Sequence, residues 1–84
     1  MLIDKLSKNE MRILEAFKEI NSTDRFLAKK ISDLSKQSNL SYFSVRNIVK
    51  SLYLSGLCEK GRKEGNADTY YLTELGQNII RKEK

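Results

Sequence analysis

Four side chains between residues 43 and 50 have the types and the spacing needed to bind a polyanion. Phe43, Arg46, Asn47 and Lys50 recur at i, i+3, i+4 and i+7, which places them on one face of a helix. An arginine can donate two hydrogen bonds to a guanine edge, an asparagine amide can pair with an adenine edge, and a lysine neutralises phosphate. The face carries no carboxylate, unlike the mixed-charge surface of a helix that is merely solvated. We interpret it as a helix face offered to nucleic acid.

The helix that would carry this face is expected over residues 42–55. Ser41 precedes it at the N-cap position, where its hydroxyl can accept a hydrogen bond from a first-turn N–H. Gly56 follows it, where a left-handed residue commonly ends a helix. A second stripe at helical spacing is apolar and is expected to enter the core: Val45, Ile48, Val49 and Leu52.

The residues just before this helix predict a tight turn from an earlier helix. The apolar end at Leu34 is followed by Asn39, which tolerates left-handed backbone, and then by Leu40 and the cap Ser41. A helix, a tight turn and a second capped helix make a helix-turn-helix motif.

The earlier helix is expected over residues 25–38, capped by Thr23 or Asp24, with Leu27, Ala28, Ile31 and Leu34 directed inward. The alternative is a short extended piece at Phe26-Leu27 and a helix that begins near Lys30. Lys36, close to the turn, is the lysine of this segment best placed to meet a phosphate.

A further helix is expected over residues 8–21, after an extended lead-in of residues 1–6. Ser7 and Glu10 have the spacing of a capping box, and Leu6 and Met11 that of a hydrophobic staple. All residues of its apolar face, including Ile13, are expected to be buried in the core.

Residues 57–72 predict a β-hairpin after the helix expected over residues 42–55. The segment 57–63 loses apolar character along its length, residues 64–68 are turn formers, and residues 69–72 (Thr-Tyr-Tyr-Leu) favour a strand. Lys60, Arg62 and Lys63 line the outgoing arm against a single acid, Glu59, and Asn66 lies in the connecting turn. A last helix over residues 74–82, capped by Thr73, would bury Leu75, Ile79 and Ile80.

Composition bounds the class of protein. The 84 residues suit one small domain, and 16 basic minus 11 acidic side chains give a net charge of +5, which suits nucleic acid. No apolar run is long enough for a membrane span, so a cytoplasmic location is expected. With no histidine and one cysteine, we expect no metal, no cofactor and no catalysis. Cys58 is interpreted as a small buried hydrophobe, with an intermolecular disulfide as the alternative. So short a core also predicts a homodimer through the terminal segments.

The sequence resembles MarR- and PadR-type winged-helix regulators from about residue 7 to residue 80. The resemblance runs through the helix-turn-helix and into the hairpin, where a helix-ending Gly-Leu leads into a charged loop and a strand that reads into Leu-Thr-x-x-Gly. The matching residues are Leu34, Ser35, Ser38, Asn39, Leu40, Ser41, Val45, Val49, Leu52, Gly56, Leu57, Tyr70, Tyr71, Leu72, Thr73 and Gly76. Asp68 is followed by Thr69, so the wing arginine of MarR proteins has no counterpart here.

This resemblance implies a mainly helical α+β fold, a winged helix-turn-helix with three helices, a hairpin wing and a C-terminal helix. It also implies a transcriptional regulator that binds double-stranded DNA sequence-specifically, with the third helix in the major groove and the wing on the backbone. The residues expected to bind DNA are Ser41, Tyr42, Phe43, Ser44, Arg46, Asn47, Lys50, Lys60, Arg62, Lys63 and Asn66.

The alternative is a protein–protein interaction module, because winged helices also serve that role. Tyr53 and Leu54 are apolar residues near the end of the helix expected over residues 42–55, and they favour this alternative if they are exposed. We expect them to pack against the wing or a dimer mate.

Overall fold

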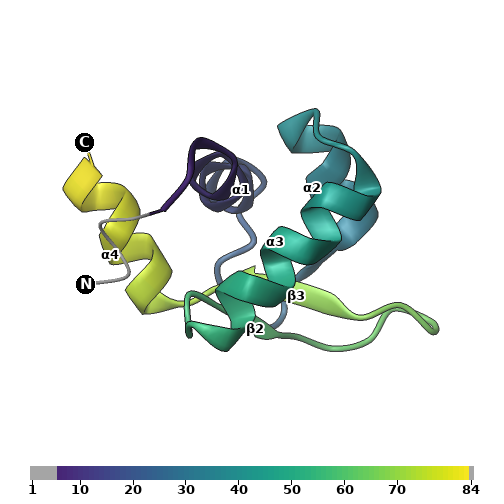
Figure 1. The fold of residues 1–84 in the computed structure, drawn as a ribbon. Coiled ribbons are helices and arrows are strands. Elements are labelled where there is room, and N and C mark those ends of the chain that lie inside the picture. The colour runs from purple at the N-terminus through teal and green to yellow at the C-terminus, as the bar shows by residue number, and fades with distance from the viewer. Residues whose placement is uncertain (1–5, 84) are drawn as a thin grey trace.

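The computed structural model describes residues 6–83 as four helices and a small antiparallel sheet (Figure 1). In chain order the elements are α1 (Lys8–Glu19), β1 (Lys29–Lys30), α2 (Ile31–Ser38), α3 (Tyr42–Leu54), β2 (Cys58–Lys60), β3 (Thr69–Leu72) and α4 (Glu74–Glu83). The expected class, α+β and mainly helical, is confirmed. The helices lie on one side of the sheet, and the loop between β2 and β3 extends away from them.

The start of α1 is formed by the predicted capping box. The Ser7 N–H donates to Glu10 Oε1 at 2.8 Å, and the Glu10 N–H donates to Ser7 Oγ at 3.1 Å. Leu6 and Met11 both pack against the core, as the staple requires. Apart from Leu6, the expected lead-in lies outside the described residues.

The second helix begins at Ile31, so the expected start near residue 25 was wrong and the alternative start near Lys30 was correct. Asp24 does not cap this helix, because its carboxylate instead accepts from the N–H groups of Phe26 and Leu27 and closes a local turn. Leu27, expected to point inward, is 43% exposed. The N–H of Lys30 donates to Asp33 Oδ2 at 3.4 Å, which gives α2 its N-terminal partner.

The short extended piece of the alternative was expected at Phe26-Leu27 but lies at Lys29–Lys30, where it forms a third strand, β1. Lys29 and Lys30 pair antiparallel with Tyr70 and Thr69 of β3, while β2 pairs with the other edge of β3 from Cys58 to Lys60. The sheet order is therefore β1-β3-β2. This pairing ties the segment before α2 to the wing.

The hairpin forms as predicted, but its first strand ends at Lys60 and not at residue 63. Gly61 still donates to the Thr69 carbonyl at 3.0 Å, and Thr69 Oγ1 donates to the Arg62 carbonyl at 2.5 Å. A smaller turn, in which Glu64 and Ala67 exchange backbone hydrogen bonds, closes the loop. The cationic residues 62 and 63 thus lie in the loop.

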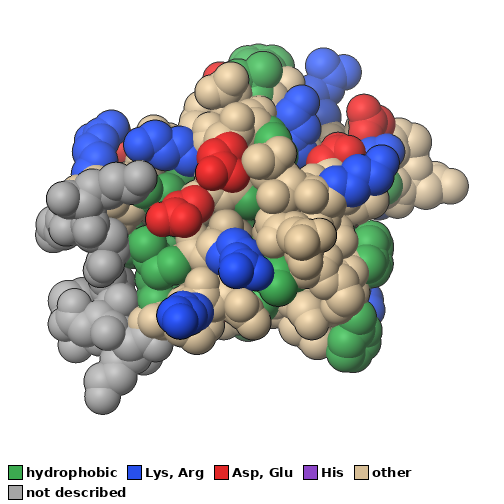
Figure 2. All heavy atoms as spheres, turned by 90° about the horizontal axis from the view of Figure 1, so that it is seen from above, with side chains coloured by type: hydrophobic (Ala, Val, Ile, Leu, Met, Phe, Trp, Pro, Cys, Tyr) green, Lys and Arg blue, Asp and Glu red, His purple; other side chains and the backbone are tan. Residues whose placement is uncertain are grey.

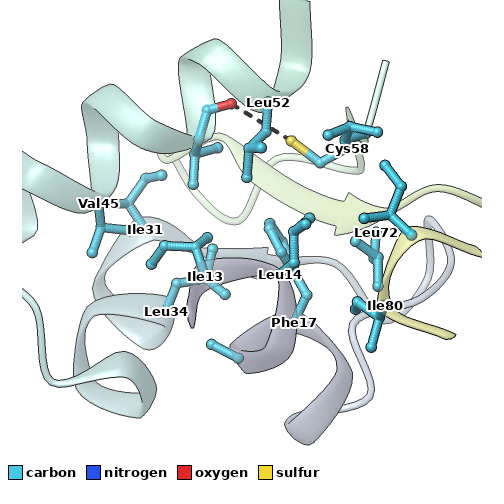
Figure 3. Packing of buried hydrophobic residues seen from close by; sticks show 14 residues of the cluster. Ile13, Leu14, Phe17, Ile31, Leu34, Val45, Leu52, Cys58, Leu72 and Ile80 are labelled. Atoms are coloured by element: carbon cyan, nitrogen blue, oxygen red, sulfur yellow. Dashed lines mark hydrogen bonds between the residues drawn. The ribbon is translucent and has the colours of Figure 1, made fainter. Parts of the chain in front are cut away.

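One hydrophobic cluster joins all four helices to the sheet (Figure 3). The apolar stripe of α3 is confirmed, since Val45, Val49 and Leu52 are buried and Ile48 is partly buried against the cluster. Leu75 was expected to be buried but is 45% exposed. The α4 residues that enter the core are Ile79 and Ile80. None of the helices formed by residues 6–83 is long and apolar enough to cross a membrane.

Candidate nucleic-acid interface

The turn before α3 and the helix N-terminus are held by serine side chains. Asn39 has the left-handed φ of 63° that the turn requires, and Ser35 Oγ donates to the Leu40 carbonyl at 2.5 Å. Ser41 Oγ then accepts from the Ser44 N–H at 3.2 Å and donates to, or accepts from, Ser44 Oγ at 3.0 Å. The predicted cap is confirmed. Both hydroxyls are therefore already engaged in local hydrogen bonds.

The C-terminus of α3 is closed by the two backbone hydrogen bonds of a Schellman motif. Gly56 takes the left-handed φ of 79° and donates to the Tyr53 carbonyl at 3.1 Å, and Leu57 donates to the Leu52 carbonyl at 2.9 Å. Because both ends are capped and the apolar stripe packs into the core, with Val45, Val49 and Leu52 buried, α3 presents its exposed residues in a fixed orientation.

The exposed surface of α3 is divided between two edges. Phe43, Asn47 and Lys50 form what we call the outer ridge, and all three are exposed, Phe43 by 69%. Tyr42 and Arg46 lie on the edge that faces the wing, since both line a hollow shared with wing residues. Every predicted DNA-binding residue of α3 except the half-buried Ser44 is exposed.

Further along the wing-facing edge, Tyr53 packs on the sheet as expected. Its ring meets that of Tyr70 edge to face, with centroids 6.3 Å apart, and Lys60 Nζ lies 5.6 Å from the Tyr53 centroid. Burial, opposed by the nearby charge of Lys60, raises the pKa of Tyr70. Leu54 makes no such contact and is 76% exposed.

Besides Glu59, the wing carries two acids, Asp68 and Glu64, that lie close to cations. Asp68 lies 3.8 Å from Lys60 Nζ and 3.9 Å from Lys63 Nζ, so one carboxylate serves two of the expected phosphate-binding lysines. Glu64 lies 3.4 Å from Lys30 Nζ and links the wing loop to the start of α2. These pairs are solvent-exposed and correspondingly weak.

The three other cations among the predicted DNA-binding residues have no ion pair to any side chain that the structure describes. They are Arg46 and Lys50 on α3 and Arg62 in the wing loop. Arg62 and Asn66 are both exposed on the loop. These residues therefore have donors available for an incoming anion.

A hollow of about 250 Å³ separates the wing from the two helices of the helix-turn-helix. Its walls come from the start of α2, the first half of α3 and the wing. The polar lining residues are Lys30, Ser32, Tyr42, Arg46, Asn66, Asp68 and Tyr70. Lys30, Ser32 and Tyr70 were not predicted as site residues, because only the pairing of β1 with β3 brings them beside Arg46, and a two-residue strand leaves no periodic pattern in the sequence.

The side of the molecule away from the sheet has a mixed charge pattern. Figure 2, which looks down on that side, shows basic and acidic side chains interspersed among neutral ones. The face of α3 between Phe43 and Lys50, by contrast, contains no acid at all.

Cys58 belongs to the core and not to any reactive site. Its side chain is fully buried, and Sγ donates to the Val49 carbonyl at 3.6 Å (Figure 3). Burial, together with the charge of Glu59, raises the pKa of the thiol to about 12. The interpretation as a small buried hydrophobe is confirmed.

Comparison with known proteins gives structural matches but no sequence family. No family model and no curated protein matches the sequence. The fold is similar to TubR from Bacillus megaterium pBM400, with a TM-score of 0.84 and 22% identity over 98% of this chain and 90% of that one. It is also similar to the DNA-binding TubR fragment from Clostridium botulinum, with a TM-score of 0.79 and 28% identity over 94% and 98% of the two chains.

MarR-family proteins share the same architecture over part of their length. A MarR-family transcriptional regulator from Silicibacter pomeroyi matches with a TM-score of 0.73 and 19% identity over 93% of this chain, which spans 49% of the regulator. These likenesses confirm the winged helix-turn-helix fold, with α2 and α3 as the helix-turn-helix and β2–β3 as the wing. The likeness to PadR proteins stays a prediction.

Proposed function

We propose that this chain is a sequence-specific, double-stranded DNA-binding protein that acts as a transcriptional regulator. In this proposal α3 enters the major groove and the wing lies along the adjacent backbone. The observation that carries it is the exposed face of α3. Arg46, Asn47 and Lys50 offer donors there, no acid competes with them on that face, and the apolar stripe behind them packs the helix against the core.

The dimensions of the parts agree with this role. An α-helix fits the major groove of B-form DNA, and the α3 face from Phe43 to Lys50 covers two helical turns. The wing loop extends beyond the helices on the same side as the N-terminal half of α3 (Figure 1). Lys60, Arg62 and Lys63 on this hairpin would neutralise phosphates beside the groove.

The similarity to the Clostridium botulinum fragment supports the same function. That protein is described as DNA-binding, and this chain matches it over nearly the full length of both. The MarR-family regulators add the same architecture in transcriptional regulators. Net charge points the same way, since +5 on 84 residues favours association with a polyanion.

The test is selection of bound sequences from a random duplex pool, followed by fluorescence anisotropy on the selected duplex. We expect enrichment of a defined sequence and a binding constant that falls steeply with salt, because each neutralised phosphate releases about 0.9 of a counterion. Lys50→Ala should weaken binding, whereas the matched control Lys18→Ala, on the exposed surface of α1, should not. Absence of affinity for any duplex at low salt would contradict the proposal.

A protein-binding module is the second candidate, because large apolar and aromatic side chains are exposed on α3, and two of them are exposed by more than two thirds. Phe43 and Leu54 are 69% and 76% exposed. On this alternative, Phe43→Ala and Leu54→Ala would abolish complex formation with a protein partner while Lys50→Ala would not. On the proposed function, Phe43 contacts a base in the groove, such as a thymine methyl group, and its loss weakens duplex binding.

We propose in addition that the chain acts as a homodimer through its terminal segments, which would place two α3 helices on a symmetric DNA site. The exposed Leu75 on α4 supports this, since a large apolar side chain near the chain end is available for a second copy.

A further inference from the structure

We infer that the hollow between α2, α3 and the wing receives one backbone phosphate of the bound DNA, held by Arg46, and that the outer ridge alone reads bases. This inference rests on the proposed function and divides the work within it. It assigns Arg46 to the backbone, although its side-chain type also suits a guanine edge.

The first support is where Arg46 lies. Tyr42 and Arg46 line the hollow together with Asn66 and Asp68 of the wing, whereas Phe43 and Asn47 do not. The hollow is walled by α2, α3 and the wing loop, which are three separate segments of the chain. A base-pair edge lies at the floor of a groove within a stacked duplex and cannot enter such a space. A phosphate projects from the duplex surface and can.

The second support is the size and the donor set of the hollow. Its volume of about 250 Å³ greatly exceeds the roughly 10–15 Å³ that holds one water molecule on the same measure, which leaves room for a larger anion. A phosphate accepts hydrogen bonds but donates none. Apart from Asp68, every polar residue that lines the hollow can donate a hydrogen bond: Lys30 and Arg46 through their cations, Ser32, Tyr42 and Tyr70 through their hydroxyls, and Asn66 through its amide.

The third support is the charge balance. Lys30 and Arg46 line the hollow with Asp68, but Asp68 lies within 4 Å of both Lys60 and Lys63, which offset its charge. Lys30 in turn lies near Glu64. The four cations and two acids of this group leave a net charge of +2. Arg46, the one lining cation without an ion pair among the described side chains, is free to bind an anion.

The outer ridge is left for base contacts. Asn47 can form two hydrogen bonds with an adenine edge, and the Phe43 ring can touch a thymine methyl group. Both side chains are exposed, and neither lines the hollow. Lys50 completes the ridge as a single flexible cation.

The test compares Arg46→Ala with Asn47→Ala on the selected duplex and on a scrambled duplex. We expect Arg46→Ala to weaken binding to both by a similar factor, on the order of tenfold, and to lower the salt slope by about one phosphate contact. Asn47→Ala should weaken only the selected duplex. Arg46→Lys should recover part of the loss, because the cation is kept but the paired donors are not.

Single methylphosphonate substitutions along the selected duplex locate the phosphate. At one position along the duplex, neutralising the phosphate should weaken binding of the native chain but not weaken binding of the Arg46→Ala variant any further. This non-additivity is expected when the arginine and that phosphate are direct partners. Arg62→Ala, whose side chain does not line the hollow, serves as the matched control. It should weaken binding but remain sensitive to that same phosphate.

The inference is overturned if Arg46→Ala abolishes sequence preference while Asn47→Ala preserves it, or if no single phosphate couples to Arg46. Thermal unfolding of each variant tests for a folding defect. Because the substituted side chains are exposed, we expect the melting temperatures of the variants to match that of the native chain. A native chain that binds no duplex at all would instead contradict the proposed function.

Discussion

At the scale of single residues, the structure separates side chains that hold the fold from those that are free to bind. Ser41 and Ser44 were predicted to contact DNA, yet their hydroxyls are already bonded to each other and to the α3 N-terminus. Arg46 and Lys50 carry charge without a partner among the described side chains. The binding free energy should therefore come mainly from the cations, with the serines acting through the helix.

Asp68 limits the positive charge of the wing, so its neutralisation should strengthen DNA binding. Asp68→Asn removes the acid shared by Lys60 and Lys63, and we expect a several-fold gain in affinity that is similar for selected and scrambled duplexes. Anisotropy titrations at two salt concentrations measure it. The control Glu74→Gln removes an equal charge at the exposed start of α4. An equal gain from both variants would mean that only net charge matters.

The raised pKa of Cys58 makes stability depend on pH in alkaline solution. The folded thiol keeps its proton up to about pH 12, whereas an unfolded one loses it near the ordinary value of 9.0. Between these pH values the folded state therefore binds more protons than the unfolded state. The contribution of the thiol to the free energy of unfolding is fully present below pH 9 and decreases as the pH rises above it. Cys58→Ala should lower the melting temperature at pH 7 but show a smaller further decrease at pH 10. The same decrease in melting temperature from pH 7 to pH 10 in the native chain and in Cys58→Ala would contradict this prediction.

At the scale of elements, helix boundaries followed local chemistry wherever a cap was present. α1 and α3 begin where Ser7 and Ser41 predicted, and α3 ends at the predicted glycine. The helix α2 began later than the main expectation because residues 29 and 30 gain strand hydrogen bonds from β3. That partner is about forty residues away in the chain, where no local pattern reports it.

Gly76 in the first turn of α4 is required by packing. A Cβ at this position would lie 2.5 Å from the Leu57 carbonyl oxygen and 2.6 Å from Leu72 Cδ1. Gly-to-Ala changes inside helices usually stabilise. Here we expect Gly76→Ala to destabilise by about 1–3 kcal/mol, because the backbone and a core leucine must both move. Urea unfolding measures the change, with Asn78→Ala on the exposed side of α4 as the control. A more stable Gly76→Ala protein would show that α4 can shift freely.

At the scale of the whole molecule, one small core supports all the elements. Its single cluster is built from every helix and two of the strands, so the stability of the wing and of α3 depends on the same residues. A domain of this size gains from further buried surface. This is the physical reason to expect self-association.

Leu75 tests the proposed dimer. We expect the native chain to sediment as a dimer at micromolar concentration and Leu75→Lys to shift it toward monomer. Because Leu75 is 45% exposed, its replacement should leave the far-ultraviolet circular dichroism spectrum unchanged. As a control, Glu74→Lys places the same cation one residue earlier. A native monomer at that concentration would remove the dimer and the symmetric DNA site.

The features that could be predicted from the amino-acid order are those that depend on near neighbours in the chain. The caps of α1, α3 and α4, the buried stripe of α3, the turn at Asn39 and the hairpin all follow from residues within a few positions of each other. The remaining features became visible in the folded molecule alone. The pairing of Lys29 and Lys30 with β3, the ion pairs of Asp68 and the hollow beside Arg46 join distant segments, whose meeting depends on how the whole core packs.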